Sequence, residues 1–165
     1  MPALACAAAL WATALPAAAQ VPPTTAEAQA YQGLHRAAWR GDLAQLKRLL
    51  AQRGGTSLEM RDAHGRTPLH VATYARQREA IRLLAQAGAS LDAFENDRYD
   101  AVTIASVADD TKTLALLLEL GASAAQTTSR YDGTALIAAA HLGHDEGVRQ
   151  LIAANGPLAP VDKLP

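Results

Sequence analysis

Residues 67–72 read Thr-Pro-Leu-His-Val-Ala and carry the most informative pattern in the chain. The hydroxyl of Thr67 can cap a helix, and Pro68 then stands at the first helical position, where its missing N–H costs nothing. The sequence therefore predicts a helix that begins at Pro68. Gly88 is placed to end a second helix in the left-handed conformation. The second helix is lined by Ile81, Leu83 and Leu84.

The same skeleton of two apolar helices and two turns recurs along the chain. Ala72 and Ala105 are 33 residues apart, and so are Gly88 and Gly121. The hydrophobic content is 50% with only 4% aromatic residues, which favours thin, closely packed helices. Each unit has an apolar face that it cannot bury alone, so stacking is expected to stabilise the array. The predicted repeats are 32–60, 61–93, 94–125 and 126–156.

With four copies in phase, residues 32–156 resemble the ankyrin-repeat family. The Thr-Pro-Leu-His-x-Ala signature of that family is intact at residues 67–72. The resemblance implies an all-α solenoid of about four helix-turn-helix repeats with projecting loops. It also implies that the chain binds another protein.

Two copies depart from the regular pattern. In the third copy the segment that begins at Asp100 replaces the signature, and Asp109-Asp110 replaces a turn glycine. Gly41 and Gly143 are predicted to form the same turn in the first and fourth copies. We expect the two adjacent acids to cap the helix that follows them. Asn155 is expected to substitute for glycine at the end of the fourth copy.

The first nineteen residues are predicted to be a signal peptide. They contain no charge, and the apolar run 3–15 is shorter than the roughly 20 residues of a membrane span. Ala17-Ala18-Ala19 then predicts cleavage before Gln20, although no Lys or Arg opens the segment. Cleavage would remove Cys6, the single cysteine, and would leave no membrane-bound segment. The alternative is a cytosolic protein that keeps its leader.

The two segments that flank the repeats are predicted to be irregular. Residues 20–31 contain Pro-Pro-Thr-Thr and are predicted to be an extended linker. Residues 157–165 resemble the start of a truncated fifth repeat. Without that repeat, part of Val148, Leu151 and Ile152 would be left uncovered, either because the array is shortened or because a partner covers its end.

Composition and motifs argue against catalysis and against nucleic-acid binding. The net charge is −1 with no basic stripe, and neither a nucleophile motif nor a glycine-rich phosphate loop occurs. We therefore expect no cofactor. A rival hypothesis is a metal-dependent enzyme that uses His64, His141 and His144. The last two are predicted to lie on different helices, because Leu142-Gly143 forms a turn. His35 and His70 are predicted to be structural.

The residues just before each turn between paired helices are predicted to form one row along a concave groove. Trp and Tyr are enriched among interface hot spots, so this row is the predicted site for a protein partner. The alternative is that its two aromatic residues only shield the inner helices. The row consists of Trp39, Tyr74, Val107 and His141, and the neighbouring Arg40 and Leu142 belong to the same predicted site.

The loops between repeats are predicted to form the second half of the binding surface. Arg98-Tyr99-Asp100 and Arg130-Tyr131-Asp132 repeat one tripeptide, in which arginine and tyrosine offer flat contacts and hydrogen-bond donors. His64 and Arg66 belong to the same predicted surface. In the alternative interpretation, the two aspartates cap helices and the arginines are solvated.

These features together predict a monomeric scaffold in the periplasm, or secreted, with another protein as its partner. The alanine-rich leader and the short array resemble the exported ankyrin proteins of Gram-negative bacteria. The resemblance implies that such a protein shields or assists a partner enzyme, sometimes one that handles oxidative stress.

Overall fold

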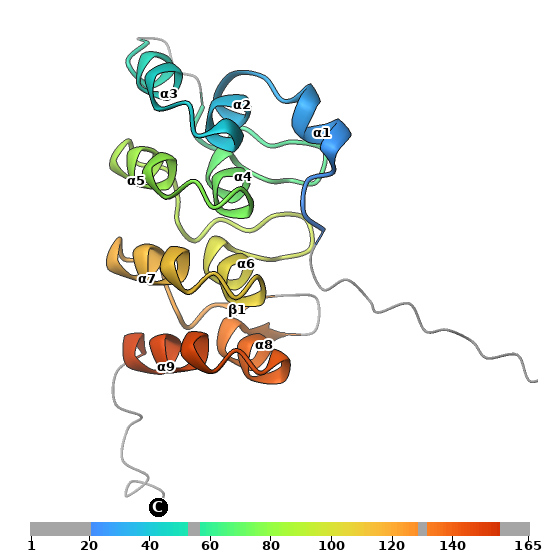
Figure 1. The fold of residues 1–165 in the computed structure, drawn as a ribbon, viewed down its shortest axis with the longest axis vertical. Helices are drawn as coiled ribbons and strands as arrows, with labels where there is room; N and C mark the ends of the chain where they lie inside the picture. The colour runs from blue at the N-terminus through green and yellow to red at the C-terminus, as the bar shows by residue number, and fades with distance from the viewer. Residues whose placement is uncertain (1–20, 53–56, 129–131, 156–165) are drawn as a thin grey trace, which may run out of the picture.

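The computed structural model describes residues 21–52, 57–128 and 132–155, and in these ranges the chain forms a stack of helix pairs (Figure 1). The repeat solenoid predicted from the sequence is confirmed. The first helices of the pairs are α2 (Gly33–Arg40), α4 (Pro68–Tyr74), α6 (Ala101–Val107) and α8 (Ala135–Leu142). The second helices are α3 (Leu43–Leu50), α5 (Arg78–Gln86), α7 (Thr111–Glu119) and α9 (Asp145–Ala154).

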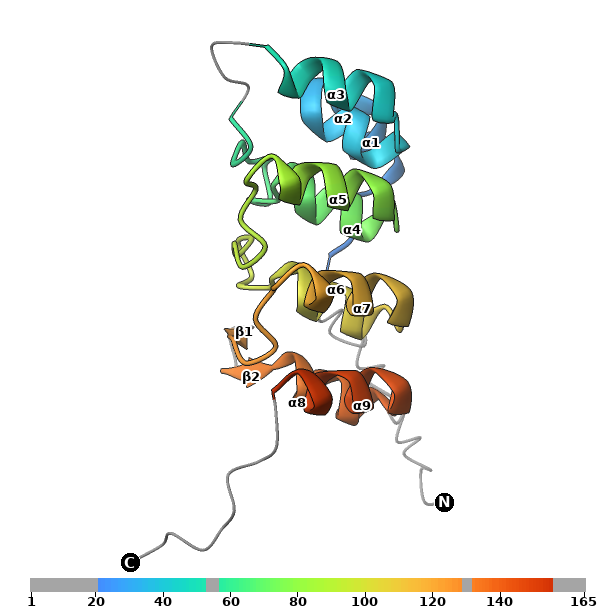
Figure 2. The same ribbon diagram turned by 90° about the vertical axis from the view of Figure 1, so that its left-hand side faces the viewer.

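The helices lie in two layers, with the first helices in one layer and the second helices in the other (Figure 1). The loops between successive pairs project to one side of the stack, as Figure 2 shows. The last of these loops contains a short hairpin with strands of two residues each. In it, β1 (Thr127–Thr128) pairs with β2 (Gly133–Thr134) in antiparallel fashion. The leader 1–19, residues 129–131 and the tail 157–165 lie outside the described residues.

Three of the first helices begin with the same kind of cap on different residues. The Thr67 hydroxyl accepts a hydrogen bond from the His70 N–H, and Pro68 is the first helical residue, as predicted. In the third pair the carboxylate of Asp100 accepts from the Thr103 N–H at 2.7 Å. Either side chain satisfies a backbone donor that a helix start leaves free, so the loss of the signature in the third copy leaves the helix intact.

The turn inside each pair needs one residue in the left-handed conformation. Gly41 and Gly143 adopt it with φ of 65° and 76°, as predicted. In the other two pairs the same position is held by Arg76 at 57° and Asp109 at 49°. Only Asp110 of the adjacent acids caps the next helix, α7.

The closing glycines confirm one prediction and correct another. Gly88 and Gly121 both have a φ of 96°, as the repeat pattern predicts. The prediction for Asn155 is wrong, because its φ is −75° and its backbone remains right-handed. Asn155 is the residue directly after its helix, a position that Ala87 and Leu120 hold in the two preceding repeats.

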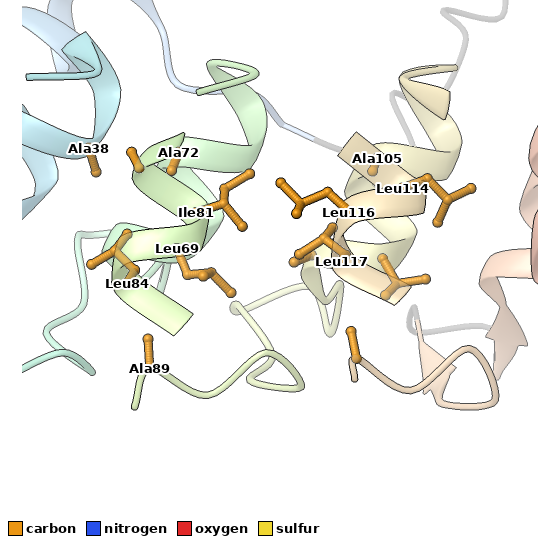
Figure 3. Close-up of a cluster of buried hydrophobic side chains, with 14 of the residues drawn as sticks. Ala38, Leu69, Ala72, Ile81, Leu84, Ala89, Ala105, Leu114, Leu116 and Leu117 are labelled. Atoms are coloured by element: carbon orange, nitrogen blue, oxygen red, sulfur yellow. The ribbon is translucent and has the colours of Figure 1, made fainter. Parts of the chain in front are cut away.

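The core lies between the two layers and runs along the stack (Figure 3). Small residues in the first helices let neighbouring pairs approach closely, and leucines from the second helices fill the space between them. Burying one such leucine contributes about 1.5–3 kcal/mol relative to an exposed side chain. Fully buried members include Ala38, Ala72, Ala139, Leu84, Leu117 and Leu151.

The last pair leaves less apolar surface uncovered than predicted. Leu151 is fully buried, so the expectation that it would be partly open is wrong. Ile152 of the same helix is 46% exposed, as predicted, and Ile137 of α8 is 60% exposed. Leu151 packs inward against the core, whereas neither isoleucine belongs to the core cluster.

The segment predicted to be an extended linker folds instead. Residues 25–30 form the helix α1 (Thr25–Ala30), which lies on the side of α2 away from α3 (Figure 1). The Thr24 hydroxyl accepts from the Glu27 N–H, and the Glu27 carboxylate accepts from the Thr24 N–H at 2.7 Å. This reciprocal capping starts the helix in spite of the prolines just before it. Among the described residues, every helix is too short or too polar to cross a bilayer.

Candidate protein-binding surface

The predicted row of residues occupies one register position in the four helix pairs. Trp39, Tyr74, Val107 and His141 each stand two residues before the left-handed residue of their turn. Because the pairs stack in register, these positions follow one another along the layer of first helices. We call the side of that layer away from the second helices, with its adjoining loops, the inner face. A binding role for the row stays a prediction.

Exposure varies along the row. His141 and Leu142 at the end of α8 are exposed, and Leu142 is 48% exposed. Tyr74 and Val107 are partly buried. Burial, together with the nearby Glu95 carboxylate, raises the pKa of the Tyr74 hydroxyl, so Tyr74 stays neutral. The row itself is therefore most open at its C-terminal end, although Arg40, beside Trp39 at the other end, is also exposed.

At its N-terminal end the row is covered by the chain itself. Tyr31, just after α1, lies edge-on to Trp39 with 6.4 Å between ring centroids. Ala28 and Tyr31 are buried with Val71 of α4 in a small apolar cluster, and Trp39 packs against it. Trp39 therefore packs against Val71 of an inner helix, as the shielding alternative predicts, and it is itself only partly covered.

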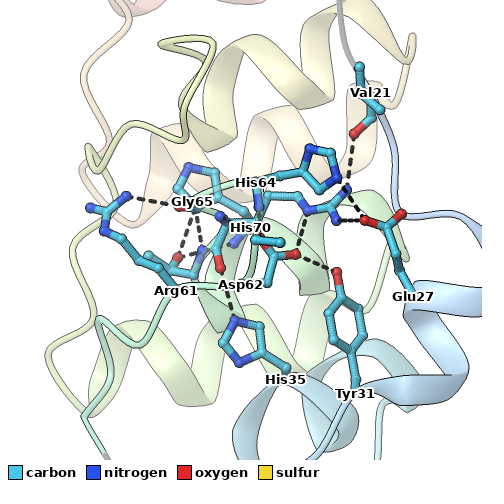
Figure 4. A network of polar contacts seen from close by, with 12 residues as sticks. Val21, Glu27, Tyr31, His35, Arg61, Asp62, His64, Gly65 and His70 are labelled. Carbon is cyan, nitrogen blue, oxygen red and sulfur yellow. Dashed lines mark hydrogen bonds and ion pairs between the residues drawn. The ribbon is translucent and has the colours of Figure 1, made fainter.

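A polar network joins α1 to the loop before α4 (Figure 4). Arg66 is only 1% exposed, and its Nε donates to the Asp62 carboxylate at 2.6 Å. Its Nη2 donates to Glu27 at 2.9 Å, and its Nη1 donates to the backbone carbonyl of Val21 at 3.1 Å. The Tyr31 hydroxyl donates at 2.8 Å to the same Asp62 oxygen that accepts from Arg66 Nε. A buried guanidinium is thus surrounded by acceptors, as such a charge requires.

The charges of this network are mutually stabilised. Hydrogen bonds from Thr24, with further help from Arg66, lower the pKa of Glu27 to about 2. Burial would raise the pKa of Asp62, but hydrogen bonds from Tyr31 and Arg66 outweigh it and lower that pKa. Burial and the bond to Asp62 raise the pKa of the Tyr31 hydroxyl. Both carboxylates are therefore ionised at neutral pH and hold the arginine between them.

The predictions of structural roles for His35 and His70 agree with the geometry. His35 Nε2 lies 2.9 Å from the backbone carbonyl of Arg66. His70 Nδ1 accepts from the Thr67 N–H at 3.1 Å, and its Nε2 lies 3.0 Å from the carbonyl of Ala93. Burial lowers the pKa of His70 to about 4, so the ring is neutral and tied to the next loop.

Two residues predicted to contact a partner are buried, so those predictions are wrong. Arg66 is 1% exposed and Tyr99 is 7% exposed. Each directly follows the left-handed residue of its loop, Gly65 or Arg98, where the chain returns toward the helices. The backbone carbonyls of Arg66 and Tyr99 accept from the N–H groups of Asp62 and Glu95, which closes each loop as a hairpin.

The repeated tripeptide serves different roles in its two copies. Arg98 is half exposed and its guanidinium lies 3.4 Å from the carboxylate of Asp132 in the next loop. Asp100 caps α6, as the alternative interpretation predicts, whereas α8 is capped by Thr134 and Asp132 adopts a φ of 54°. Arg130 and Tyr131 lie outside the described residues.

The three histidines of the metal hypothesis belong to separate surroundings. His141 lies on α8 and His144 is the residue that precedes α9, which confirms that they belong to different elements. His144 Nδ1 lies 2.8 Å from the carbonyl of Ser106, and His64 Nε2 lies 2.8 Å from Glu27. In the described ranges, no three His, Cys, Asp or Glu side chains are grouped as a metal site.

Sequence reasoning missed the contribution of α1. Glu27, Tyr31 and Asp62 were not among the predicted site residues, although the first two lie over the start of the inner face and Tyr31 is bound there by Asp62. One signal was available: Thr24 followed three residues later by Glu27 is a capping-box pattern and predicts a helix start. The long-range contacts to Arg66 and Trp39 had no local signal.

Comparison with protein families agrees with this architecture. A family model described as ankyrin repeats (3 copies) matches residues 34–128, which is more than half of the chain. Ankyrin repeats generally mediate protein–protein interaction, and the family is typically a non-catalytic interaction module. By its matched repeats and its stacked helix pairs, the chain belongs to the ankyrin-repeat family.

Proposed function

We propose that this protein is a monomeric, non-catalytic scaffold that binds a partner protein through its inner face and loop tips. The observation that carries the proposal is the row of side chains in one register position along the first helices. A stack of repeats presents such a row as one extended surface, which suits a large partner better than a small ligand.

The centre of the proposed contact lies on the last two pairs. Val107 is partly open there, and His141 and Leu142 are exposed, whereas Trp39 lies against Tyr31. Arg98 adds a half-exposed cation on the loop side. A protein contact surface combines an apolar centre with a polar rim, and Leu142 and Val107 would supply the apolar part here.

A matched pair of variants tests this assignment. The partner is first captured by crosslinking in cells that produce the protein, and its purified form is then titrated with each variant. We expect Leu142→Ala to weaken binding at least fivefold, because it removes an exposed apolar contact. Ile152→Ala is the comparison, since Ile152 is an equally exposed aliphatic residue, 46% against 48%, on a second helix. Weaker binding of Ile152→Ala alone would place the partner on the end of the stack instead. Equal affinity of both variants and the parent chain would refute the assignment.

We also propose that the protein works in the periplasm. Support comes from the uncharged apolar leader with its Ala17-Ala18-Ala19 end. Mass spectrometry of protein from fractionated cells tests this proposal. An N-terminus at Gln20 in the periplasmic fraction is expected. An N-terminus at Met1 in the cytosolic fraction would favour the cytosolic alternative.

A further inference from the structure

Residues 21–31, which we call the arm, lie on the first part of the inner face, the surface that we propose binds a partner. The arm consists of four residues without regular structure, the helix α1 and Tyr31. It lies against the first two helix pairs, over Trp39 and Val71, and beside the loop that carries Arg66 (Figures 1 and 4). The repeats thus hold a short peptide segment, which here belongs to their own chain.

The contacts resemble those by which a protein recognises a peptide. The main-chain carbonyl of Val21 accepts a hydrogen bond from Arg66, so this contact does not depend on the side chain at position 21. The Glu27 carboxylate pairs with Arg66 at 2.9 Å and with His64 at 2.8 Å. Four residues later, the Tyr31 hydroxyl donates to Asp62. Tyr31 follows α1 directly and its N–H still donates to the Glu27 carbonyl, so the two residues keep the four-residue spacing of one helix face and reach the repeats together.

The receiving groups all belong to the repeats. Asp62, His64 and Arg66 lie in the loop before α4, and Trp39 and Val71 lie on α2 and α4. We call these five residues the arm site. Arg66 has two carboxylate partners, Asp62 from its own loop and Glu27 from the arm. Removing the arm leaves Asp62 as the remaining carboxylate, so an incoming segment gains most if it restores the second one.

We propose that the arm site is a docking site for a short helical segment of a partner protein that carries a carboxylate four residues before a tyrosine. In the isolated protein the arm fills this site and competes with the partner. This inference rests on the proposed function and names the chemistry of the partner segment. Since a tethered segment has an effective concentration in the millimolar range, the partner needs additional contacts, which the exposed end of the row at His141 and Leu142 offers.

A peptide with the arm's own sequence tests the site without knowledge of the partner. The peptide spans residues 21–32, and the full chain carries Trp11→Phe so that Trp39 is the only tryptophan. In the test chain the arm is loosened by Glu27→Gln and Tyr31→Ala, which leave every residue of the arm site unchanged. The shift of the Trp39 indole N–H signal in ¹⁵N NMR spectra reports binding.

We expect the peptide to bind the loosened chain at least tenfold more tightly than the chain with the intact arm. A peptide that carries the same two substitutions is the matched control and should produce no saturable shift. If circular dichroism shows that the double variant is less folded, Glu27→Gln alone replaces it with the same criterion. Equal binding of the peptide to both chains, or no binding to either, overturns the inference.

The purified partner separates this inference from the proposed function. A partner that binds the loosened chain more tightly, and that loses affinity with Leu142→Ala, supports both. A partner that depends on Leu142 but binds chains with intact and loosened arms equally overturns the arm site and leaves the proposed function standing. A partner indifferent to Leu142 that binds the loosened chain more tightly supports the arm site and refutes the centre of contact on the last pairs.

Discussion

His70 joins the start of its own helix to a loop carbonyl 23 residues further along the chain. One ring nitrogen accepts from the Thr67 N–H, and the other lies at hydrogen-bond distance from the carbonyl of Ala93 in the next loop. The ring and Thr67 are buried, so the Thr67 N–H depends on the ring rather than on water. One side chain thereby fixes the start of a helix and the position of the neighbouring loop.

Replacing His70 with glutamine should therefore destabilise the protein. We expect a loss on the order of 1–3 kcal/mol, because at least one buried backbone group is left without its partner. Urea unfolding followed by circular dichroism measures the difference. His141→Gln is the control, since His141 is exposed on α8 and its replacement should change stability by less than about 0.5 kcal/mol. Similar losses for the two variants would contradict the role of the buried ring.

The same residue should make stability depend on pH. The pKa of His70 in the folded protein is about 4, below its usual 6.5. As pH falls from about 6.5 toward 4, the unfolded chain binds a proton at this position and the folded chain does not, so stability falls. Unfolding curves at pH 7 and pH 4.5 should show a smaller drop for His70→Gln than for the parent chain. An identical drop would show that other groups cause the acid sensitivity.

For single residues, the sequence predicts the structural role when the hydrogen-bond partner lies close by in the chain. The roles of Thr67, Pro68 and His70 follow from a six-residue pattern, because cap and partner lie within one helical turn. The burial of Arg66 and Tyr99 could not be predicted in this way. It depends on which side of a hairpin faces the helices and, for Arg66, on an arm that lies 39 residues earlier in the chain.

Among the elements, the turn inside each helix pair tolerates several residue types at one left-handed position. Glycine holds it in two pairs, and Arg76 and Asp109 hold it in the others. A residue with a Cβ is strained there by about 1–2 kcal/mol, although aspartate suffers less than most. The next residue, Asp110, caps α7 through Thr113 and pairs with Arg78. Adjacent acids therefore have opposite effects on the same turn.

Two substitutions should separate these effects. Asp109→Gly is expected to stabilise the protein by up to about 1 kcal/mol, because glycine adopts a positive φ without strain. Asp110→Ala is expected to destabilise it by about 1–2 kcal/mol through loss of the cap. Thermal unfolding of both variants and of the parent chain shows whether each substitution raises or lowers the melting temperature. The account fails if Asp109→Gly lowers the melting temperature or Asp110→Ala leaves it unchanged.

The helix α1 shows where prediction of elements stops. Its capping pattern at Thr24 and Glu27 is visible in the sequence, but a helix of six residues has too few hydrogen bonds to persist alone. Its stability comes from Tyr31 and Ala28 packing on Val71, and from Glu27 pairing with Arg66. The repeat helices were predictable because the same pattern recurs, whereas α1 occurs once among the described residues.

Across the whole molecule, the two ends of the stack differ. The first pair is covered on its inner side by the arm, and the middle pairs are packed from both sides. The described part of the last pair packs mainly on the pair before it, and Ile137 and Ile152 remain exposed. The stability of a stacked array is approximately a sum of terms within repeats and between neighbours, so a pair with one neighbour lacks one interface term.

Local stability should therefore decrease from the middle of the stack toward α8 and α9. In native-state hydrogen exchange, we expect the amides of α4, α5, α6 and α7 to be the most protected, because Leu84 and Leu117 are buried between neighbouring pairs. Leu151→Ala should accelerate exchange in α8 and α9 well before it affects α4, because its contacts lie in the last described pair. Leu84→Ala is the matched change in the middle and should accelerate exchange throughout. Equal protection from α2 to α9, or the same exchange pattern for the two variants, would mean that the protein unfolds as one cooperative unit rather than pair by pair.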